Sequence, residues 1–378
     1  MNNKVLAFML LIVFCIMGCT SKDRNENSLK GETIELQFPS SLLLQATLPE
    51  EYPERLMRYA VDWKDVDIDA AIHTLLSGQP QEHYDYAEGD GYRYIDDHHT
   101  NQLLNMYNKD IHGGCVFLIE EAMRKCEDLQ EVSRSEQPNY NQQVMGNRLF
   151  FDYSSSKELE FASKKEISEE IESTMMKLGY GEVEITVLAR DAATANQNRE
   201  IYNRICDQMG REENAIDDPF TEEDEDYYIG MREVIGDIPV VEGGWYTERL
   251  EGISTQASMY ALYNKKYGLT DLSIFHYFQI VSEIDDLDII SPDQALLAYI
   301  DFYNKSIHLT DTSITRIELN YVILADGEGL YIRPCWMIYT ETKTENYIPS
   351  TEEFAYEYDV YAVSADTGEL LSGNEIPR

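Results

Sequence analysis

The sequence has few basic residues for its length. Lysine and arginine number 30 against 70 aspartates and glutamates, so the 378 residues carry a formal net charge of −40. Nucleic acids and anionic lipid headgroups are bound by positive surfaces, and we therefore expect no binding of nucleic acid. The acidity is explained most simply as a solubilising surface, although it also suits a divalent cation or a basic protein partner.

Long apolar runs are scarce as well. The longest extends from Val5 to Met17, follows the basic residue Lys4, and is too short to span a membrane comfortably. A short apolar run behind a positive charge is typical of an export signal. We therefore expect residues 1–18 to be a signal peptide that is removed from the mature protein.

The run ends with Ile16-Met17-Gly18-Cys19, which resembles the lipobox of bacterial lipoproteins. In that family the cysteine is diacylated and becomes the mature N-terminus. The resemblance implies lipidation at Cys19, where two acyl chains give a stable anchor, and an ordinary signal peptide with an incidental cysteine is the alternative. Residues 19–31 then form a flexible tether, and we expect a lipid-anchored protein on the extracytoplasmic face of the cell membrane.

Cysteines are few, and none forms a CxxC pair. The four beyond the N-terminal segment are Cys115, Cys126, Cys206 and Cys335. Their spacing argues against a structural zinc site, and four cysteines allow three connectivities among which the sequence does not choose. A chain of this length does not need disulfides to fold. We expect mostly free, buried thiols, with a bridge from Cys115 to Cys126 as the alternative.

The signatures of the common enzyme classes are also missing. The sequence has no GxSxG elbow, no HExxH helix, no P-loop and no paired GxGxxG motif. Ser154 and Lys157 have the SxxK spacing of penicillin-recognising enzymes, but the companion motifs are absent and a serine-rich loop is preferred. We expect no catalytic residue and no cofactor, and a novel hydrolase is the weakest alternative.

The clearest positive pattern lies in residues 291–378. Ser291 and Gln294 have the spacing of a capping box at the start of a helix. From Ile314 the apolar period becomes that of strands, which continue to Leu371. This part is predicted to be one helix packed on an antiparallel sheet.

Residues 151–290 follow the same order in a divergent form. Ser163 and Glu166 repeat the capping box, Gly179 ends the helix, and an alternating strand follows. The acidic stretch 217–226 is expected to be a solvated loop before the next strand. We predict a first unit of the same kind as the last.

Residues 32–150 are less regular. Residues 33–38 and 148–154 alternate as strands do, whereas residues 67–76 and 116–129 have the pattern of helices. We predict an N-terminal α+β subdomain here. The whole chain is accordingly expected to be α+β, with tandem units of a helix packed on an antiparallel sheet.

The best metal candidates are His83, Asp85, Asp97 and His98. Imidazole and carboxylate groups are suitable ligands for a divalent ion, and a hairpin closed at residues 89–91 brings the two patches together. The adjacent histidines at 98 and 99 point in different directions on a strand. An exposed polar loop that binds no metal is therefore the preferred interpretation.

Trp245 and Tyr246 are the aromatic residues least expected in a core, because they follow two glycines. Most other aromatic residues alternate within predicted strands, where they form cross-strand or core pairs. An aromatic pair outside the strands suits stacking on a ligand. We take these two residues as the candidate recognition site.

Two local features of the last part of the chain bear on its sheet. Pro334 favours an edge position for its strand, because proline has no N–H to donate. Asp366-Thr367-Gly368 has the composition of a ligand-gripping loop, but Asp and Gly are also turn residues. We predict a turn between two strands.

The stretches SPDQAL, PCWMIY and YDVYAVSADTGELL resemble the PepSY-like modules of exported bacterial proteins, including YycH- and YycI-type regulators and clostridial lipoproteins. The resemblance covers about 90 C-terminal residues well and residues 163–290 loosely. It implies a non-catalytic regulator that inhibits a peptidase or modulates a membrane-bound sensor kinase. Similarity of fold is only an analogy for function.

These observations lead to one functional expectation and one alternative. We expect a lipid-anchored, non-enzymatic envelope protein of regulatory or scaffolding type that acts through contacts with a membrane or envelope protein. The alternative is a ligand-binding lipoprotein for a sugar, a peptide or a divalent cation.

Overall fold

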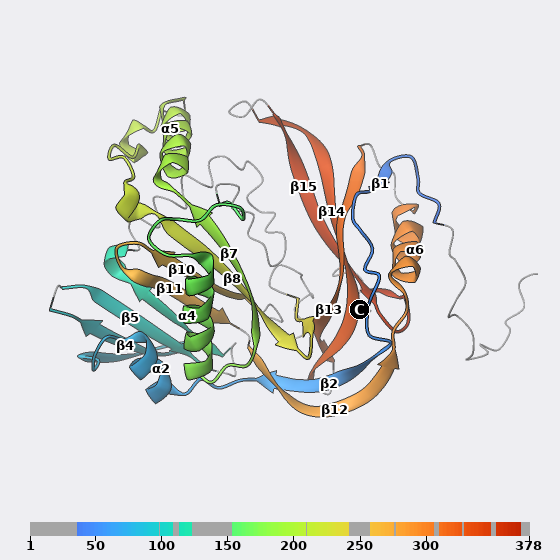
Figure 1. Ribbon diagram of the computed structural model, residues 1–378, viewed down its shortest axis with the longest axis horizontal. Coiled ribbons are helices and arrows are strands. Elements are labelled where there is room, and N and C mark those ends of the chain that lie inside the picture. Colours follow the sequence, from blue (N-terminus) through green and yellow to red (C-terminus); the bar gives the residue numbers. More distant parts are fainter. Residues whose placement is uncertain are drawn as a thin grey trace, which may run out of the picture. The chain divides into compact units, whose positions relative to one another are not determined.

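The computed structural model describes residues 36–97, 99–108, 113–122, 153–208, 210–241, 258–275, 277–305, 310–326, 329–348 and 353–371. The chain divides by its contacts into residues 1–36 and residues 37–378. All helices and strands described below belong to the second unit. It is a mixed α+β structure made mainly of strands, which form two large sheets (Figure 1).

The nine-stranded sheet has the order β3-β4-β5-β6-β11-β10-β8-β7, with β9 paired to β8. Its strands are β3 (Glu82–Tyr86), β4 (Gly89–Ile95), β5 (Asn101–Tyr107), β6 (Gly114–Ile119), β7 (Val183–Arg190), β8 (Asp226–Ile235), β9 (Ile238–Pro239), β10 (Ser258–Asn264) and β11 (Gly268–Phe275). Helices α2 (Ile68–Leu75) and α4 (Lys164–Lys177) share one hydrophobic core with this sheet, in which Ala71 and Ile171 join Leu104 and Ala261. Both helices therefore pack on the sheet.

The start of α4 is built as the sequence predicts. The Glu166 N–H donates to the Ser163 hydroxyl at 3.2 Å, and the Ser163 N–H donates to the Glu166 carboxylate at 2.8 Å. Gly179 follows the helix with φ +81°, a left-handed conformation that glycine adopts readily and that ends many helices. The same reciprocal capping box is present at Ser291, so both predicted helix starts are confirmed.

The seven-stranded sheet has the order β1-β13-β14-β15-β16, and β2 pairs with both β12 and β14. Its strands are β1 (Leu42–Leu44), β2 (Arg55–Trp63), β12 (Phe278–Asp288), β13 (Thr312–Asp326), β14 (Gly329–Ile348), β15 (Glu353–Ser364) and β16 (Leu370–Leu371). Helix α6 (Pro292–Tyr303) packs on this sheet, with the rings of Tyr299 and Tyr361 4.9 Å apart. The strands predicted between Ile314 and Leu371 are all present.

Each of the two sheets contains strands from more than one of the segments that the sequence predicted. β1 and β2 from residues 32–150 and β12 from residues 151–290 belong to the sheet of residues 291–378. The remaining strands of residues 32–150 join those of residues 151–290. Strand partners that are far apart in sequence leave no local signal, so these sheets were not predicted. Residues 36–38, predicted as part of a strand, belong to none.

One helix prediction differs from the structure, and one helix was not predicted. Residues 116–119 belong to strand β6, and a helix begins only at Glu120. The buried, apolar residues of β6 lie in a central strand, where an apolar run does not distinguish helix from strand. The sequence interpretation also missed α5 (Ala192–Gln208), whose asparagines bond the loop beside it: Asn196 and Asn203 accept from the N–H groups of Phe220 and Ile216.

The acidic stretch 217–226 is not solvated throughout. Asp226 is buried at the start of β8 and binds Arg190 through two hydrogen bonds, Nε to Oδ1 at 3.0 Å and Nη2 to Oδ2 at 2.8 Å. Tyr153 donates its hydroxyl proton to the same carboxylate at 2.6 Å, and its ring lies 4.4 Å from the Arg190 guanidinium carbon. The prediction of a solvated loop was therefore wrong at this residue.

Pro334 lies in a central strand, so the edge prediction was wrong. β14 pairs with β13 on one side from Gly329 to Thr342, and on the other side it pairs first with β2 and then with β15. The pairing with β2 ends at Ile332 and that with β15 begins at Cys335, and the Ala365 N–H donates to the Pro334 carbonyl. Pro334, which has no N–H, therefore lies where β15 replaces β2 as the neighbour of β14.

Cys115, Cys206 and Cys335 are free and buried, as predicted, while Cys126 lies outside the described residues. Burial raises the pKa of the Cys115 thiol to about 12, and it does the same for Cys335. Both thiols therefore stay protonated near neutral pH. Within the described part of the chain, no helix has the length and hydrophobicity needed to cross a membrane.

The Asp366-Thr367-Gly368 segment is the turn before β16, which confirms the prediction. Gly368 has φ +71° and donates its N–H to the Ser364 carbonyl at 2.9 Å. Asp366 accepts hydrogen bonds from Ser364 and from Arg333. Burial opposes ionisation of Asp366, but these two partners hold its pKa below the usual range. The carboxylate therefore ties the turn to β14.

Replacing Gly368 with valine is expected to lower the free energy of unfolding by about 1–2 kcal/mol, because a β-branched residue is strained at positive φ. A Cβ at this position would meet the nearest atom, Ile290 Cδ1, only at 3.5 Å, so strain and not a clash causes the loss. Gly368→Asn should lose much less, since asparagine tolerates this region. Urea unfolding measures both, and equal losses would contradict the explanation.

Candidate functional site

Strands β2 and β12 form a two-stranded ribbon that is open along part of its inner edge (Figure 1). β12 pairs with β2 from Arg55 to Trp63, whereas β14 pairs with β2 only from Tyr59 to Val61. Among the described residues, no strand therefore lies beside Arg55–Arg58 on the side away from β12. Unpaired backbone at a strand edge is able to pair with another extended segment.

The direction of the backbone groups follows from two hydrogen bonds. The Ile289 N–H donates to the Glu54 carbonyl at 2.9 Å, so the backbone of Glu54 faces β12. Successive residues of a strand turn their backbone groups to opposite sides. The N–H and C=O groups of Arg55 and Met57 therefore face the open side, and the Tyr321 hydroxyl indeed donates to the Met57 carbonyl at 3.0 Å.

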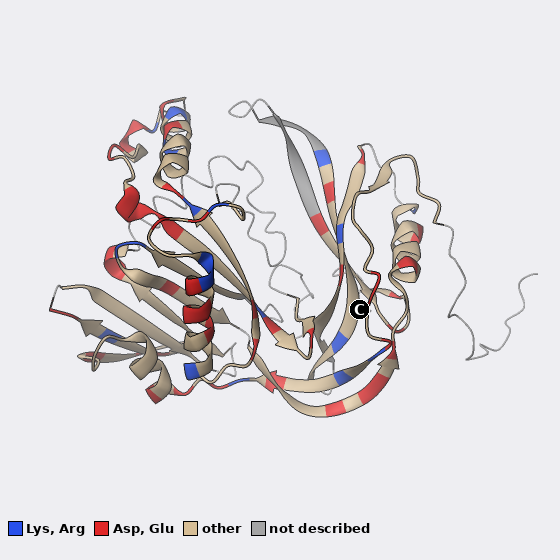
Figure 2. Cartoon of the chain, viewed as in Figure 1, with Lys and Arg blue, Asp and Glu red and all other residues tan. Residues whose placement is uncertain are grey.

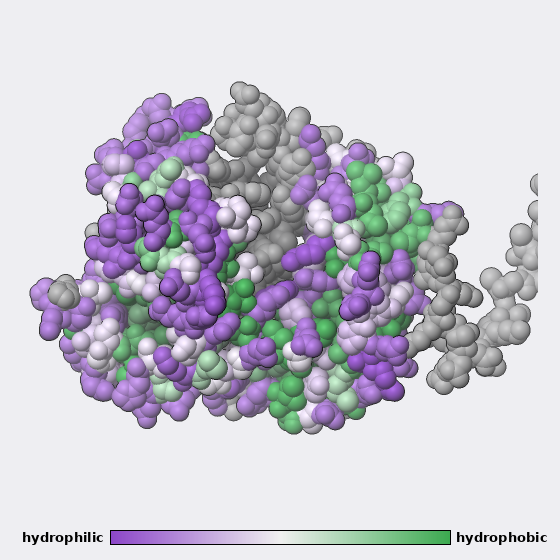
Figure 3. Space-filling model, in the orientation of Figure 1, coloured by the Kyte–Doolittle hydropathy of each residue, from purple (hydrophilic) through white to green (hydrophobic). Residues whose placement is uncertain are grey.

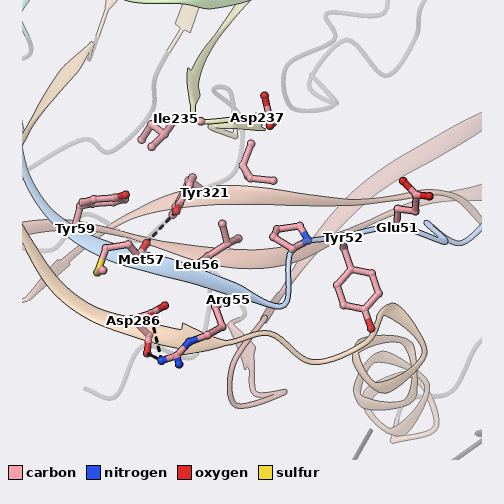
Figure 4. A pocket seen from close by; sticks show the side chains of 13 residues that line it. Glu51, Tyr52, Arg55, Leu56, Met57, Tyr59, Ile235, Asp237, Asp286 and Tyr321 are labelled. Carbon is pink, nitrogen blue, oxygen red and sulfur yellow. Dashed lines mark hydrogen bonds and ion pairs between the residues drawn. The ribbon is translucent and has the colours of Figure 1, made fainter. Parts of the chain in front are cut away.

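A pocket of about 810 Å³, named here the β2-edge pocket, lies along this open edge (Figure 4). It is lined by Glu51, Tyr52, Pro53, Arg55, Leu56, Met57, Tyr59, Ile235, Gly236, Asp237, Ile238, Asp286 and Tyr321. They come from β2 and the chain that enters it, from the ends of β8 and β9 with the turn between them, and from strands β12 and β13. Figure 4 shows Asp237 and Ile235 across the pocket from Leu56.

The aromatic residues of the pocket are fixed by their neighbours. Tyr52 meets Trp336 edge to face with ring centroids 5.5 Å apart, and Tyr59 lies 6.1 Å from Tyr321. Burial, and after it the charge of Glu283, raises the pKa of Tyr59, so this phenol is neutral near physiological pH. The pocket therefore offers rigid aromatic faces for apolar or cationic groups.

The pocket is acidic. Three carboxylates, of Glu51, Asp237 and Asp286, face one guanidinium, that of Arg55. Arg55 pairs with Asp286 at 2.9 Å, while Glu51 and Asp237 form no ion pair within the described residues. Acidic residues also follow one another along β12 (Figure 2). These charges favour a basic ligand.

Strand β12 exposes three large apolar side chains. Ile280, Val281 and Ile284 of β12 are 45%, 63% and 45% exposed. Figure 3 shows hydrophobic surface beside the ribbon at the lower margin of the molecule. Two bulges interrupt the pairing of β12 near these residues, and bulges are one way in which proteins protect an edge strand.

Close to the pocket along β8, Glu233 is 8% exposed and its Oε2 atom has no hydrogen-bond partner. Burial raises the pKa of Glu233 to about 8, although the Phe278 N–H and the charge of Lys64 act in the opposite direction. The carboxyl group is therefore largely protonated at neutral pH.

The residues predicted from the sequence do not lie in this pocket. Trp245, Tyr246, Cys19 and His98 lie outside the described residues. His83 and Asp85 lie on the β3–β4 hairpin, which reverses at residues 87–88 and not at 89–91. They are brought together with Asp90, whereas Asp97 lies outside this group.

The β2-edge pocket was missed because its parts are far apart in the sequence. One element is the stretch Glu51–Tyr59 and another the turn at Gly236. The available signal was the pair of tyrosines at positions 52 and 59 around two arginines. These residues indicate a pocket only when the pairing of β2 is known.

No family model and no curated protein matches this chain. A crystal structure of an uncharacterized protein from Eubacterium rectale ATCC 33656 is similar to it, with a TM-score of 0.60 and 15% sequence identity. The match covers 88% of this chain and 91% of that one. At this identity the likeness shows a shared fold and carries no function.

Proposed function

We propose that this chain is a lipid-anchored, non-enzymatic protein of the cell envelope that acts through protein contacts, and that the β2-edge pocket receives an extended, basic segment of its partner. The observation that carries the proposal is the open edge at Arg55–Arg58 beside an acidic, aromatic pocket. Extended peptides bind sheet edges through main-chain hydrogen bonds, and adjacent pockets select their side chains.

The partner segment adds a short strand beside β2. Its backbone bonds the outward groups of Arg55 and the N–H of Met57, whose carbonyl already accepts from Tyr321. A lysine or arginine of the segment reaches Glu51 or Asp237. The neighbouring tyrosines contact the aliphatic part of that side chain.

In this proposal, the lipid anchor holds the β2-edge pocket close to its partner. Lipidation at Cys19, followed by the tether of residues 19–31, confines the pocket near the membrane and raises its effective concentration toward membrane partners. The PepSY-like arrangement of tandem units is part of the proposal. Its support is the repeated order of a capped helix followed by antiparallel strands, α4 before β7 and α6 before β13.

A photo-crosslinking residue placed at Leu56 in living cells is expected to give one reproducible adduct with an envelope protein. The same residue at Met176, which is 67% exposed on α4, is the matched control and should not give that adduct. Asp237→Lys should reduce the yield several-fold by repelling the basic segment, and Cys19→Ser should reduce it by releasing the chain from the membrane. No adduct, or identical adducts from Leu56 and Met176, would contradict the proposal.

The alternative is a small ligand, such as a sugar or a free peptide, in the same pocket. A ligand at 100 times its Kd stabilises a protein by about 2.7 kcal/mol, so a thermal-shift screen detects it. A ligand whose stabilisation is lost in Tyr59→Ala, together with the absence of a protein adduct, would favour this alternative.

A further inference from the structure

The β3–β4 hairpin gathers an imidazole and two carboxylates on one face. His83 lies opposite Tyr92, and Asp85 lies opposite Asp90. Side chains two positions apart on a strand share a face, and so do directly opposite side chains. The possible ligand atoms of His83, Asp85 and Asp90 all lie within 4.8 Å of one another.

The imidazole is already oriented toward both carboxylates. Its Nε2 atom lies 3.0 Å from Asp90 Oδ1 and 3.6 Å from Asp85 Oδ1. The ring stacks on Tyr92, with centroids 4.9 Å apart and planes 15° from parallel. On the opposite face the Tyr84 ring lies so close over Gly91 that a Cβ there would be 2.1 Å from it. The hairpin register that holds the three groups is thus fixed by packing.

The charges on this face are unbalanced. Asp85 and Asp90 lie directly opposite each other on the two strands. Two like charges in these positions destabilise the strand pair. Among the described residues, only His83 forms an ion pair with either of them. The two carboxylates therefore give this face of the hairpin a negative electrostatic potential. A bound divalent cation would neutralise it.

We propose that His83, Asp85 and Asp90 bind one divalent transition-metal ion of the Zn²⁺ class. One imidazole nitrogen and two carboxylate oxygens suit Zn²⁺, whereas Mg²⁺ and Ca²⁺ prefer oxygen ligands alone. Three protein ligands leave a coordination position open for water or for a group of a partner. The site shares no residue with the β2-edge pocket, so the metal proposal is tested independently of the proposed function.

The test titrates the metal-stripped full chain with Zn²⁺ and with Co²⁺. We expect saturable binding of one ion per chain, and a Co²⁺ spectrum without a thiolate charge-transfer band because no cysteine takes part. His83→Ala should abolish binding, and Asp85→Asn should weaken it by about tenfold or more. Asp97→Asn, an exposed carboxylate outside the group, is the control and should bind as the parent does.

The variants are expected to fold, because the His83 and Asp85 side chains are 53% and 87% exposed, and far-UV circular dichroism checks this. Binding that survives His83→Ala overturns the proposal, as does a thiolate band in the Co²⁺ spectrum. The absence of saturable binding by the parent chain overturns it as well.

Discussion

Replacing Asp226 with asparagine is expected to lower the free energy of unfolding by about 3–5 kcal/mol, because it removes a carboxylate that binds a buried guanidinium. The side chains of Arg190 and Asp226 are only 4% and 3% exposed. Two hydrogen bonds join them, and Tyr153 contacts both. Chemical denaturation at neutral pH, followed by circular dichroism, measures the loss.

A surface ion pair provides the control for this prediction. Lys165 and Glu169 lie 3.5 Å apart on α4 with side chains that are 84% and 63% exposed, and Glu169→Gln should change stability by at most about 0.5 kcal/mol. Arg190→Met combined with Asp226→Leu should recover much of the loss, since an apolar pair leaves no buried charge. A double variant as unstable as Asp226→Asn would show that the pair is needed for more than mutual neutralisation.

Replacing Glu233 with glutamine is expected to stabilise the protein at neutral and alkaline pH while leaving its stability in acid unchanged. Burial raises the pKa of Glu233 from 4.5 to about 8 in the folded state. The folded chain therefore keeps a proton that the unfolded chain releases above its own pKa. The stability of the parent is full below pH 4.5 and falls as the pH rises toward 8.

This difference in pKa corresponds to roughly 3–5 kcal/mol between the two ends of the pH range. Glutamine has no charge to bury, so the variant does not lose this amount. Unfolding free energies of parent and variant, measured at about pH 5, 7 and 8.5, should diverge steadily as the pH increases. Lys64 and Tyr277, the titratable groups that interact with Glu233, are present in both proteins, so their effects largely cancel.

The matched control is Glu182→Gln, which changes an exposed carboxylate beside the start of β7. It should change the free energy of unfolding by at most about 0.5 kcal/mol. If Glu233→Gln behaves in the same way, the carboxyl group titrates as an exposed glutamate does and the interpretation of its burial is wrong.

The sequence predicted those parts of the fold whose cause is local. The capping boxes at Ser163 and Ser291 place a hydroxyl and a carboxyl or amide group three residues apart, and this chemistry is complete within one helical turn. The turn at Gly368 needs only one residue with positive φ. Such features are visible without knowledge of any distant contact.

Features that depend on partners far along the chain were not predictable. The alternation in β13 and β14 indicated strands. No sequence pattern indicated that β2 pairs with β14, or that the neighbour of β14 changes beside Pro334. The apolar run of β6 fitted a helix as well as a buried strand. The β2-edge pocket exists only because β2 leaves β14, so it could not be found before the pairing was known.

The pairing of β1 with β13 also constrains how the chain folds. The Tyr303 hydroxyl donates to the Ser41 carbonyl next to this pairing, and the two residues are 262 positions apart. Contacts of such separation carry a large loop-closure entropy and slow the search for the native state. Local contacts around α4, β7 and β8 can form early, whereas β1 and β2 must wait for the last quarter of the chain. Folding is therefore expected to finish only after synthesis is complete.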